Sequence, residues 1–515
     1  MVLGLLLVAF TGCQASLAEA GLVDSRAPLS AELLSEDVHY LASDELAGRS
    51  PGTAGIARAE EYVAKAFGRT GLEPLPGFED FFIGLPLYRH GYDPDRTALV
   101  LDGPGGRVTA ELERDFKPLF FSGTGEAEAP LAFAGYGITA PEHGYDDYAG
   151  LDVRGRLVLV LRYEPGADDP QSVFEGTDHS RHAWLMTKAR TAHGYGAAGM
   201  ILVSDTLYHR GADDLRVFPT LSLSPDEPPR LPRSAGPPEP AFPVIHLSRA
   251  TLLAAAGWSE EQLAEAQRKL NDWQPAAEVD FPRIGVRLSV RERQEAQVVP
   301  VRNVAALLPG ADPELRDEWI LVGAHHDHLG AFDGPGDTVY SGADDNASGV
   351  AGVLALARHF AARSGKQAPA RTLVFMTFTA EEQGLLGSRA LVEGQLIPLE
   401  AVRFMVNLDM IGRNPERPLE LHGSGFETEI REVVEKAGEE LGVTVRFESR
   451  SVRAVSDFYP FHQRGIPVLS LFTGTHEDYH RPSDTAEKLD YERMERIVGL
   501  AARVVESLAA REAPP

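Results

Sequence analysis

Two patterns of hydrophobic and polar residues follow each other along the chain. In residues 55–72 apolar side chains recur at helical spacing, and Gly68 and Gly71 are placed to end that helix. From about residue 85 to 275 the pattern changes to short β-rich runs between turns. Proline-rich residues 224–243 predict an extended surface loop within this region. The apolar stripe of the helix consists of Ile56, Ala59, Tyr62, Val63, Ala66 and Phe67.

From about residue 295, strand-length apolar runs alternate with helical segments. Residues 346–362 carry apolar side chains at helical spacing, and so does the last helix, from Met494 to Leu508. This alternation predicts an α/β fold with a mostly parallel sheet flanked by helices. Ligands bind beyond the carboxyl ends of the strands in such sheets. The predicted strands are 303–310, 318–327, 371–382, 402–410 and 466–472.

These boundaries predict one α/β domain that is interrupted by a β-rich insert. Its N-terminal part would span residues 28–85, the insert 86–275, and the main part 276–512. The chain is 43% hydrophobic and 24% charged, which is typical of a globular protein. Its net charge of -27 repels phosphate backbones, so we expect no nucleic-acid partner. The oligomeric state stays open.

The first 20 residues predict a signal peptide. Residues 2–10 are almost wholly apolar but too short to span a membrane. Gly12 and Cys13 follow, and the small residues before the only cysteine resemble a bacterial lipoprotein signal, in which a lipidated Cys13 would begin the mature chain. The bulky Phe10 and the absence of Lys or Arg before the apolar run depart from that pattern, so a plain secretory signal is the alternative. We expect an exported protein, periplasmic or on the outer surface, with membrane contact only through Cys13.

Acidic and histidine side chains follow the ends of several predicted strands. Because the carboxyl ends of parallel strands share one sheet edge, these side chains should converge. A single cluster would be explained as solvated loop charge or helix capping, but that explanation does not account for all of them. Mixed carboxylate and imidazole ligands suit zinc, and the carboxylates suffice for a bridged pair of ions. The clusters are His325 to His328, Asp344 and Asp345, Glu381 and Glu382, Asp409, and Tyr479 with His480.

Strand alternation separates roles within the first cluster. It places His325 and Asp327 on one side of the strand and His326 on the other. His325 is therefore the predicted ligand and Asp327 the group that orients it, while His326 and His328 are predicted to be structural. The adjacent Glu381 and Glu382 cannot easily share one task, so one would ligate and the other act as general base.

Residues 476–480 read HEDYH, which matches the H-E-x-x-H pattern of zinc proteases. That chemistry requires a helix that carries both histidines on one face. An apolar strand that ends at Gly474 precedes the pattern, and Pro482 follows it, so the segment is predicted to be a loop. His476 and Glu477 would then be bystanders.

The ordered motifs GAHHDHLG, SGADDNASGV, TAEEQGLLGS, NLDMIGR and DYHRPSDT resemble the co-catalytic di-zinc exopeptidase family of secreted bacterial aminopeptidases and glutamate carboxypeptidase. LASDELAGRSPGTAG, near residue 50, is similar to the N-terminal region of that family, and residues 133–166 are similar to a protease-associated domain. The resemblance implies a metal-dependent exopeptidase, most specifically an aminopeptidase. It would hydrolyse N-terminal residues of peptides with a water that bridges two zinc ions per chain.

The same resemblance implies individual roles. His325 and Asp409 would hold one zinc, Glu382 and His480 the other, and Asp344 would bridge them. Glu381 would be the general base, and the hydroxyl of Tyr479 would stabilise the oxyanion. A cis peptide bond is expected between Asp344 and Asp345.

Three other functions remain as alternatives. A glutaminyl cyclase would use one zinc, and a non-catalytic receptor-like binding protein would lack an intact site. A carboxypeptidase would need a cation such as Arg413 or Arg453 facing the substrate carboxylate.

Overall fold

The computed structural model describes residues 28–510 except 120, 177–179, 209–214, 216–219, 226–241, 294, 332–337, 364–366, 425–428 and 449–454. The predicted signal peptide with Cys13, most of the proline-rich loop, and Arg453 lie outside the described residues. Within the described part of the chain, no helix has the length and apolar character needed to cross a membrane.

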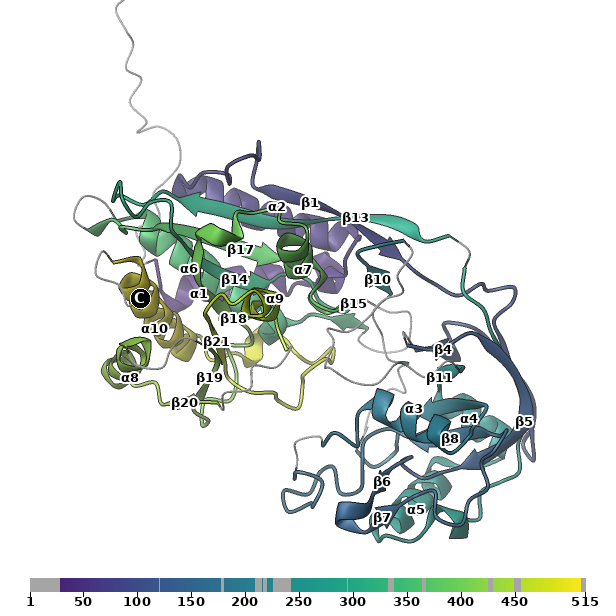
Figure 1. The fold of residues 1–515 in the computed structure, drawn as a ribbon. Coiled ribbons are helices and arrows are strands. Elements are labelled where there is room, and N and C mark those ends of the chain that lie inside the picture. Colours follow the sequence, from purple (N-terminus) through teal and green to yellow (C-terminus); the bar gives the residue numbers. More distant parts are fainter. Residues whose placement is uncertain are drawn as a thin grey trace, which may run out of the picture.

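Two β-sheets organise the chain (Figure 1). The first has nine strands, in the spatial order β10 (Leu221–Ser222), β1 (Phe82–Arg89), β13 (Gln297–Leu308), β17 (Thr372–Phe378), β14 (Trp319–His325), β18 (Val402–Leu408), β21 (Val468–Phe472), β19 (Leu419–Ser424) and β20 (Val445–Phe447). The four central strands β17, β14, β18 and β21 are parallel, whereas β13 and β19 join them in antiparallel register. The parallel part of the sheet is therefore its centre, where the predicted site residues lie.

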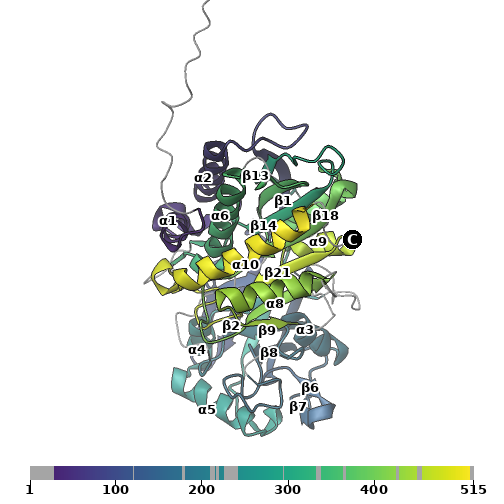
Figure 2. The same cartoon turned by 90° about the vertical axis from the view of Figure 1, so that its left-hand side faces the viewer.

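Helices cover both faces of this sheet, as the sequence predicted. One face packs against α1 (Ala31–Leu41), α2 (Ala54–Thr70), α6 (Gly349–Ala361), α8 (Glu429–Leu441) and α10 (Tyr491–Ala509), which face the viewer in Figure 2. The other face packs against α7 (Leu386–Glu393) and α9 (Phe458–Gln463). The alternation of β13 shows the two faces, because Val304 and Ala306 point into the first core and Ala305 and Leu307 into the second.

The predicted helical patterns are confirmed by burial. Helix α2 begins after Thr53, whose hydroxyl accepts the Ile56 amide, and ends before Gly71, which has φ 77°. Its residues Val63 and Phe67 are fully buried, and each such side chain stabilises the fold by about 1.5–3 kcal/mol relative to exposure. In α10 the predicted apolar positions are likewise buried.

The second sheet forms the insert. It has eight strands, in the order β3 (Gly106–Ala110), β2 (Ala98–Gly103), β12 (Gly285–Val290), β5 (Gly125–Phe133), β8 (Leu157–Leu161), β9 (Gly199–Val203), β11 (Val244–Leu247) and β4 (Phe116–Pro118). The helices of the insert are α3 (Leu185–Gly194), α4 (Arg249–Ala256) and α5 (Glu260–Asn271). Two short strand pairs complete the described elements: β6 (Thr139–Ala140) with β7 (Tyr145–Asp146), and β15 (Gly330–Ala331) with β16 (Val339–Tyr340).

The structure corrects the predicted limits of the insert. Strand β12 lies beyond residue 275 but pairs with β2 and β5, so the insert extends to about residue 290. Conversely, β10 lies inside the predicted insert but pairs with β1 at the edge of the nine-stranded sheet. Strand pairing over long sequence distances decides both boundaries, and the composition of the chain does not reveal it.

Candidate metal centre

The exits of four parallel strands bring the predicted metal ligands together. His325 ends β14, Asp409 follows β18, Glu382 follows β17, and His480 lies in the loop after β21. The Nε2 atom of His325 lies 3.4 Å from Asp409 Oδ1, and the Nε2 atom of His480 lies 3.1 Å from Glu382 Oε2. Each of these pairs belongs to a different half of one buried cluster.

The carboxylate between the two halves is Asp345, not Asp344. Its Oδ1 lies 3.3 Å from His325 Nε2, and its Oδ2 lies 3.1 Å from His480 Nε2. Asp345 is accordingly a member of both groups of side chains that could hold a metal, and Asp344 belongs to neither. The cis peptide bond follows Asp345, so the prediction of one between Asp344 and Asp345 was also wrong by one residue.

Asp344 points away from this cluster because consecutive side chains leave the chain in different directions. Its Oδ1 accepts a hydrogen bond from the Gly412 amide at 2.7 Å, and its Oδ2 lies 3.3 Å from His476 Nε2. The backbone amides of Asp344 and Asp345 both donate to the carboxylate of Asp484. The His476 side chain is only 3% exposed, so it is a buried partner of Asp344 and not a bystander.

The HEDYH segment is a turn and not a helix, as predicted. His480 has φ 54°, which a helix does not contain. His480 is thus presented by the loop after β21, and neither His476 nor Glu477 belongs to a group of described side chains that could hold a metal.

His328 was predicted to be structural, but it borders the cluster. Its Nδ1 lies 2.8 Å from Glu382 Oε1 and 3.8 Å from Asp345 Oδ2. Glu382 is therefore contacted by histidines at both oxygens. The second group of side chains that could hold a metal consists of His328, Asp345 and Glu382, and His480 lies beside this group. His326 does lie apart, with its Nδ1 3.0 Å from Thr377 Oγ1. The repeated histidines of GAHHDH were the available signal, but alternation alone put His328 on the side of His326.

Asp327 holds the turn that carries the two glutamates. Its Oδ1 accepts the Glu381 amide at 2.9 Å, and its Oδ2 accepts the Glu382 amide at 3.3 Å. The Nδ1 atom of His325 is closer to the Asp327 carbonyl oxygen, at 3.2 Å, than to the carboxylate, at 3.8 Å. Asp327 consequently orients His325 through its backbone and the glutamate pair through its side chain.

The two glutamates have opposite electrostatic environments. Burial, reinforced by the negative charge of Glu382, raises the pKa of Glu381 well above its ordinary value. Burial also acts to raise the pKa of Glu382, but the positive charge of His480 and the hydrogen bond with His328 outweigh it and lower the pKa to about 2. Glu381 is therefore the more basic carboxyl group of the pair, and Glu382 is the more acidic one.

Tyr479 stacks on His480, with ring centroids 3.9 Å apart. Tyr479 is 38% exposed as a residue. Partial loss of solvation at its phenol, followed by the charges of Asp345 and Glu382, raises the pKa of Tyr479 above its ordinary value. Its hydroxyl therefore stays protonated near neutral pH and can donate a hydrogen bond.

The residues present fit a metal pair. Asp345 Oδ2, His480 Nε2 and His328 Nε2 are buried atoms that lack a hydrogen-bond partner among the described residues. Buried ionised carboxylates are costly unless they are paired or coordinate a metal, and here three of them converge with imidazoles. The mixture of carboxylate oxygen and imidazole nitrogen suits zinc.

Arg413, considered as a receptor for a substrate carboxylate, already has a partner. Its Nη1 lies 2.9 Å from Asp478 Oδ2, and its side chain is 14% exposed. Lys488 pairs with the other oxygen of Asp478 at 2.7 Å.

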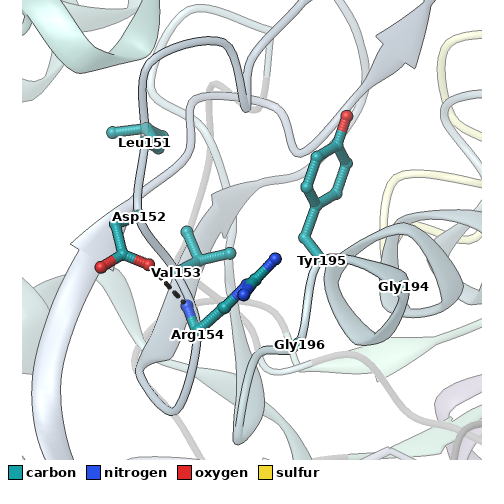
Figure 3. Close-up of a pocket in the computed structure, with 7 residues that line it drawn as sticks. All are labelled: Leu151, Asp152, Val153, Arg154, Gly194, Tyr195 and Gly196. Carbon is teal, nitrogen blue, oxygen red and sulfur yellow. Dashed lines mark hydrogen bonds between the residues drawn. The ribbon is translucent and has the colours of Figure 1, made fainter.

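A pocket of about 300 Å³ lies in the insert, apart from this cluster (Figure 3). In it the Asp152 side chain accepts the backbone amide of Arg154 at 3.3 Å, and the Tyr195 ring stands on the opposite side. None of the predicted site residues lines it.

Comparisons with known proteins give a family match, similar sequences and similar structures. Residues 303–505 match the family described as "Peptidase family M28". Aminopeptidase YwaD of Bacillus subtilis (strain 168) is 33% identical over 210 residues, which cover 38% of this chain and 42% of that protein. The match thus spans less than half of that relative's length.

Solved structures share the fold over nearly the whole chain. A zinc aminopeptidase from Bacillus subtilis superposes with a TM-score of 0.58 at 19% identity, covering 95% of this chain and 98% of that one. An aminopeptidase from Aneurinibacillus sp. strain AM-1 gives a TM-score of 0.56 at 21% identity, covering 94% and 95%. The predicted α/β fold and the resemblance to zinc exopeptidases are confirmed.

Proposed function

We propose that this chain, whose residues 303–505 match peptidase family M28, is a metal-dependent exopeptidase, most specifically an aminopeptidase that uses two zinc ions. The observation that carries the proposal is the position of Asp345. Its Oδ1 faces His325, and its Oδ2 faces His480 and His328 on the other side. A shared carboxylate of this kind is what a two-metal site requires.

In this proposal His325, Asp345 and Asp409 would hold one ion. Asp345 and Glu382 would hold the other together with His480, whose Nε2 lies 3.1 Å from an oxygen of each. When bound, zinc would supply Lewis-acid polarisation of the peptide carbonyl and would make a water more acidic. Glu381 accepts the proton of the attacking water and delivers it to the leaving amine. The neutral hydroxyl of Tyr479 donates a hydrogen bond to the oxyanion that forms.

The alternatives gain less support from the site. Both ligand groups are intact, which argues against a glutaminyl cyclase with one zinc and against a receptor-like binding protein. A carboxypeptidase would need a cation free to meet the substrate, and Arg413 is engaged by Asp478. The relatives named above, an aminopeptidase by sequence and two aminopeptidases by fold, favour the amino end of the peptide.

The remaining expectations extend this proposal. The substrates are peptides, no nucleic acid takes part, and the insert acts as a protease-associated domain. The protein is exported to the periplasm or outer surface, and Cys13 provides its only attachment to the membrane.

Two matched variants test the roles in the site. Glu381→Gln keeps the shape but cannot accept a proton, so turnover should fall on the order of 10²-fold or more while two zinc ions remain bound. Glu382→Gln replaces a ligand by a neutral amide, so zinc should be lost together with activity. Zinc per chain and turnover are measured on peptides with free or blocked termini, with and without chelator. Near-normal turnover in Glu381→Gln, or hydrolysis of N-terminally blocked peptides only, would contradict the proposal.

A further inference from the structure

A buried arginine from the N-terminal part of the chain lies directly behind the metal centre. Arg49 ends the short helical segment Asp44–Arg49, is 1% exposed, and has φ 50°. Residues other than glycine rarely adopt this left-handed backbone conformation, so the contacts around Arg49 must hold its backbone there. The preceding Gly48 is pressed against the β15–β16 pair, since a Cβ there would lie 2.4 Å from the Gly330 carbonyl oxygen.

The Arg49 guanidinium donates its described hydrogen bonds to backbone carbonyls. Its Nε donates to His326 at 2.9 Å, and its Nη1 and Nη2 donate to Ser341 at 2.7 Å and Gly342 at 2.9 Å. A further bond reaches Leu41 in α1. The carbonyl of Arg49 in turn accepts the amide of His328 at 3.2 Å.

These carbonyls flank two different metal ligands. His326 follows His325 directly, and Gly342 precedes Asp345 by three residues. The two ligands meet at 3.3 Å in the half of the cluster that also contains Asp409. The guanidinium is planar and rigid, so a single side chain fixes both backbone segments relative to each other.

The charge of Arg49 also suits this place. Burial lowers the pKa of Arg49 to about 10, against the opposing effect of the carboxylates of Asp327, Asp345, Asp484 and Glu382. It is therefore a cation at neutral pH, and its hydrogen bonds within the described part of the chain go to backbone carbonyls.

We propose that Arg49 is a positioning residue of the metal centre, which ties the backbone after His325 to the backbone before Asp345 and thereby sets the separation of these two ligands. The inference rests on the proposed function only in that the cluster binds zinc. It adds a role for the motif LASDELAGRSPGTAG, which none of the ligands or catalytic groups explains.

The test compares Arg49→Lys with Arg371→Lys. Lysine keeps the charge but lacks the planar fork, so it cannot hold both segments at once. Arg371 offers a matched control. It directly precedes β17, at the end of that strand opposite to the site. Its side chain pairs with Glu318 at 2.8 Å and donates to the carbonyl of Leu508 in α10. Zinc affinity is measured by competition with a chromogenic chelator, and the visible spectrum of the cobalt(II)-loaded protein reports ligand geometry.

We expect Arg49→Lys to weaken zinc binding by about 10–100-fold, as loss of outer-shell partners does, and to alter the cobalt spectrum. Arg371→Lys should lower the stability to urea but change zinc affinity by less than about twofold, because its contacts are remote from the ligands. Equal zinc affinity and an unchanged spectrum in Arg49→Lys would overturn the proposal. Failure of both Arg49→Lys and Arg49→Gln to fold with zinc present would also overturn it, since Arg49 would then serve the fold as a whole. A wild-type protein that binds no zinc, cobalt or manganese would instead refute the proposed function.

Discussion

Replacing each of two adjacent aspartates by asparagine should separate metal binding from stability. Asp345→Asn removes the charge from the carboxylate that faces both His325 and His480. Asp344→Asn alters a side chain that is equally buried but contacts Gly412 and His476. The two changes are chemically identical and one residue apart, so each serves as the control for the other.

The structure sets the size of both effects. A neutral amide is a poor zinc ligand, and Asp345 belongs to both ligand groups, so its loss should exceed the 10–100-fold weakening typical of outer-shell changes. Asparagine at position 344 can still accept the Gly412 amide, which lies 2.7 Å away, but it weakens the contact with His476 at 3.3 Å. The bond from the Gly412 amide changes from a charged acceptor, worth about 1.5–3 kcal/mol, to a neutral one, worth about 0.5–1.5 kcal/mol, so Asp344→Asn should lower the free energy of unfolding by about 1–1.5 kcal/mol.

Zinc per chain after gel filtration, urea unfolding of the metal-free proteins, and turnover of an N-terminally free peptide give the three readouts. Asp345→Asn should lose bound zinc and turnover, and Asp344→Asn should retain two ions with reduced stability. Loss of zinc in Asp344→Asn while Asp345→Asn keeps both ions would refute the assignment of the shared ligand.

Three further predictions concern the fold, its pH dependence and the N-terminus. Gly349→Ala would place a Cβ 2.4 Å from the Leu408 carbonyl oxygen, so it should lower the free energy of unfolding in urea by about 1–3 kcal/mol. Gly194→Ala, with open space around its Cβ, should leave that free energy unchanged, and equal effects of the two changes would contradict the prediction. A hydrogen bond from His359 and the charge of Arg363 lower the pKa of Glu506 below its ordinary 4.5, so its stabilisation is complete above that pH and is lost as the pH falls through the folded value. The stability difference between Glu506→Gln and the wild type should therefore shrink between pH 6 and pH 3, and a constant difference would count against it. Mass spectrometry of the exported protein should find a lipidated Cys13 as its first residue, and an intact soluble chain with an unmodified Cys13 would contradict the lipoprotein proposal.

Periodicity predicted the elements well because burial imposes it directly. The stripes of α2 and α10 appear in the core as expected, and the exits of β14, β17, β18 and β21 gather the acids and histidines at one sheet edge. A loop after a strand, closed by Pro482, was also sufficient to reject a helical HEDYH motif. The helical stripes and the loop depend on residues that are near one another in the sequence, and the shared sheet edge follows from the common direction of the parallel strands.

The errors arose where backbone direction or distant contacts decide the outcome. The sequence Asp344-Asp345 does not reveal which of the two carboxylates faces the histidines, because the direction of each side chain depends on the local backbone. The backbone here has a cis peptide bond after Asp345. His328 contacts Glu382 across 54 positions, and Arg49 contacts Gly342 across 293, so neither partner was visible from its own neighbourhood. The edge strand β10 likewise depends on its distant partner β1.

Because β10 lies within the insert in sequence but pairs with the nine-stranded sheet, the insert cannot simply be exchanged for that of another protein. The amide of Thr220 donates to the Gln383 side chain at 2.8 Å, one residue beyond Glu382, and the Ser222 hydroxyl lies 2.7 Å from His90 Nε2. Excision of residues 90–290 as a cassette would therefore strip β1 of its neighbour and expose unpaired amides and carbonyls, which favour aggregation. It would also remove the hydrogen bond from Thr220 to Gln383, the residue that follows Glu381 and Glu382. A chimaera that carries a foreign insert should keep the Thr220–Ser222 segment of this chain, because the segment pairs with β1 in the nine-stranded sheet. The β-rich insert is therefore not a separable domain.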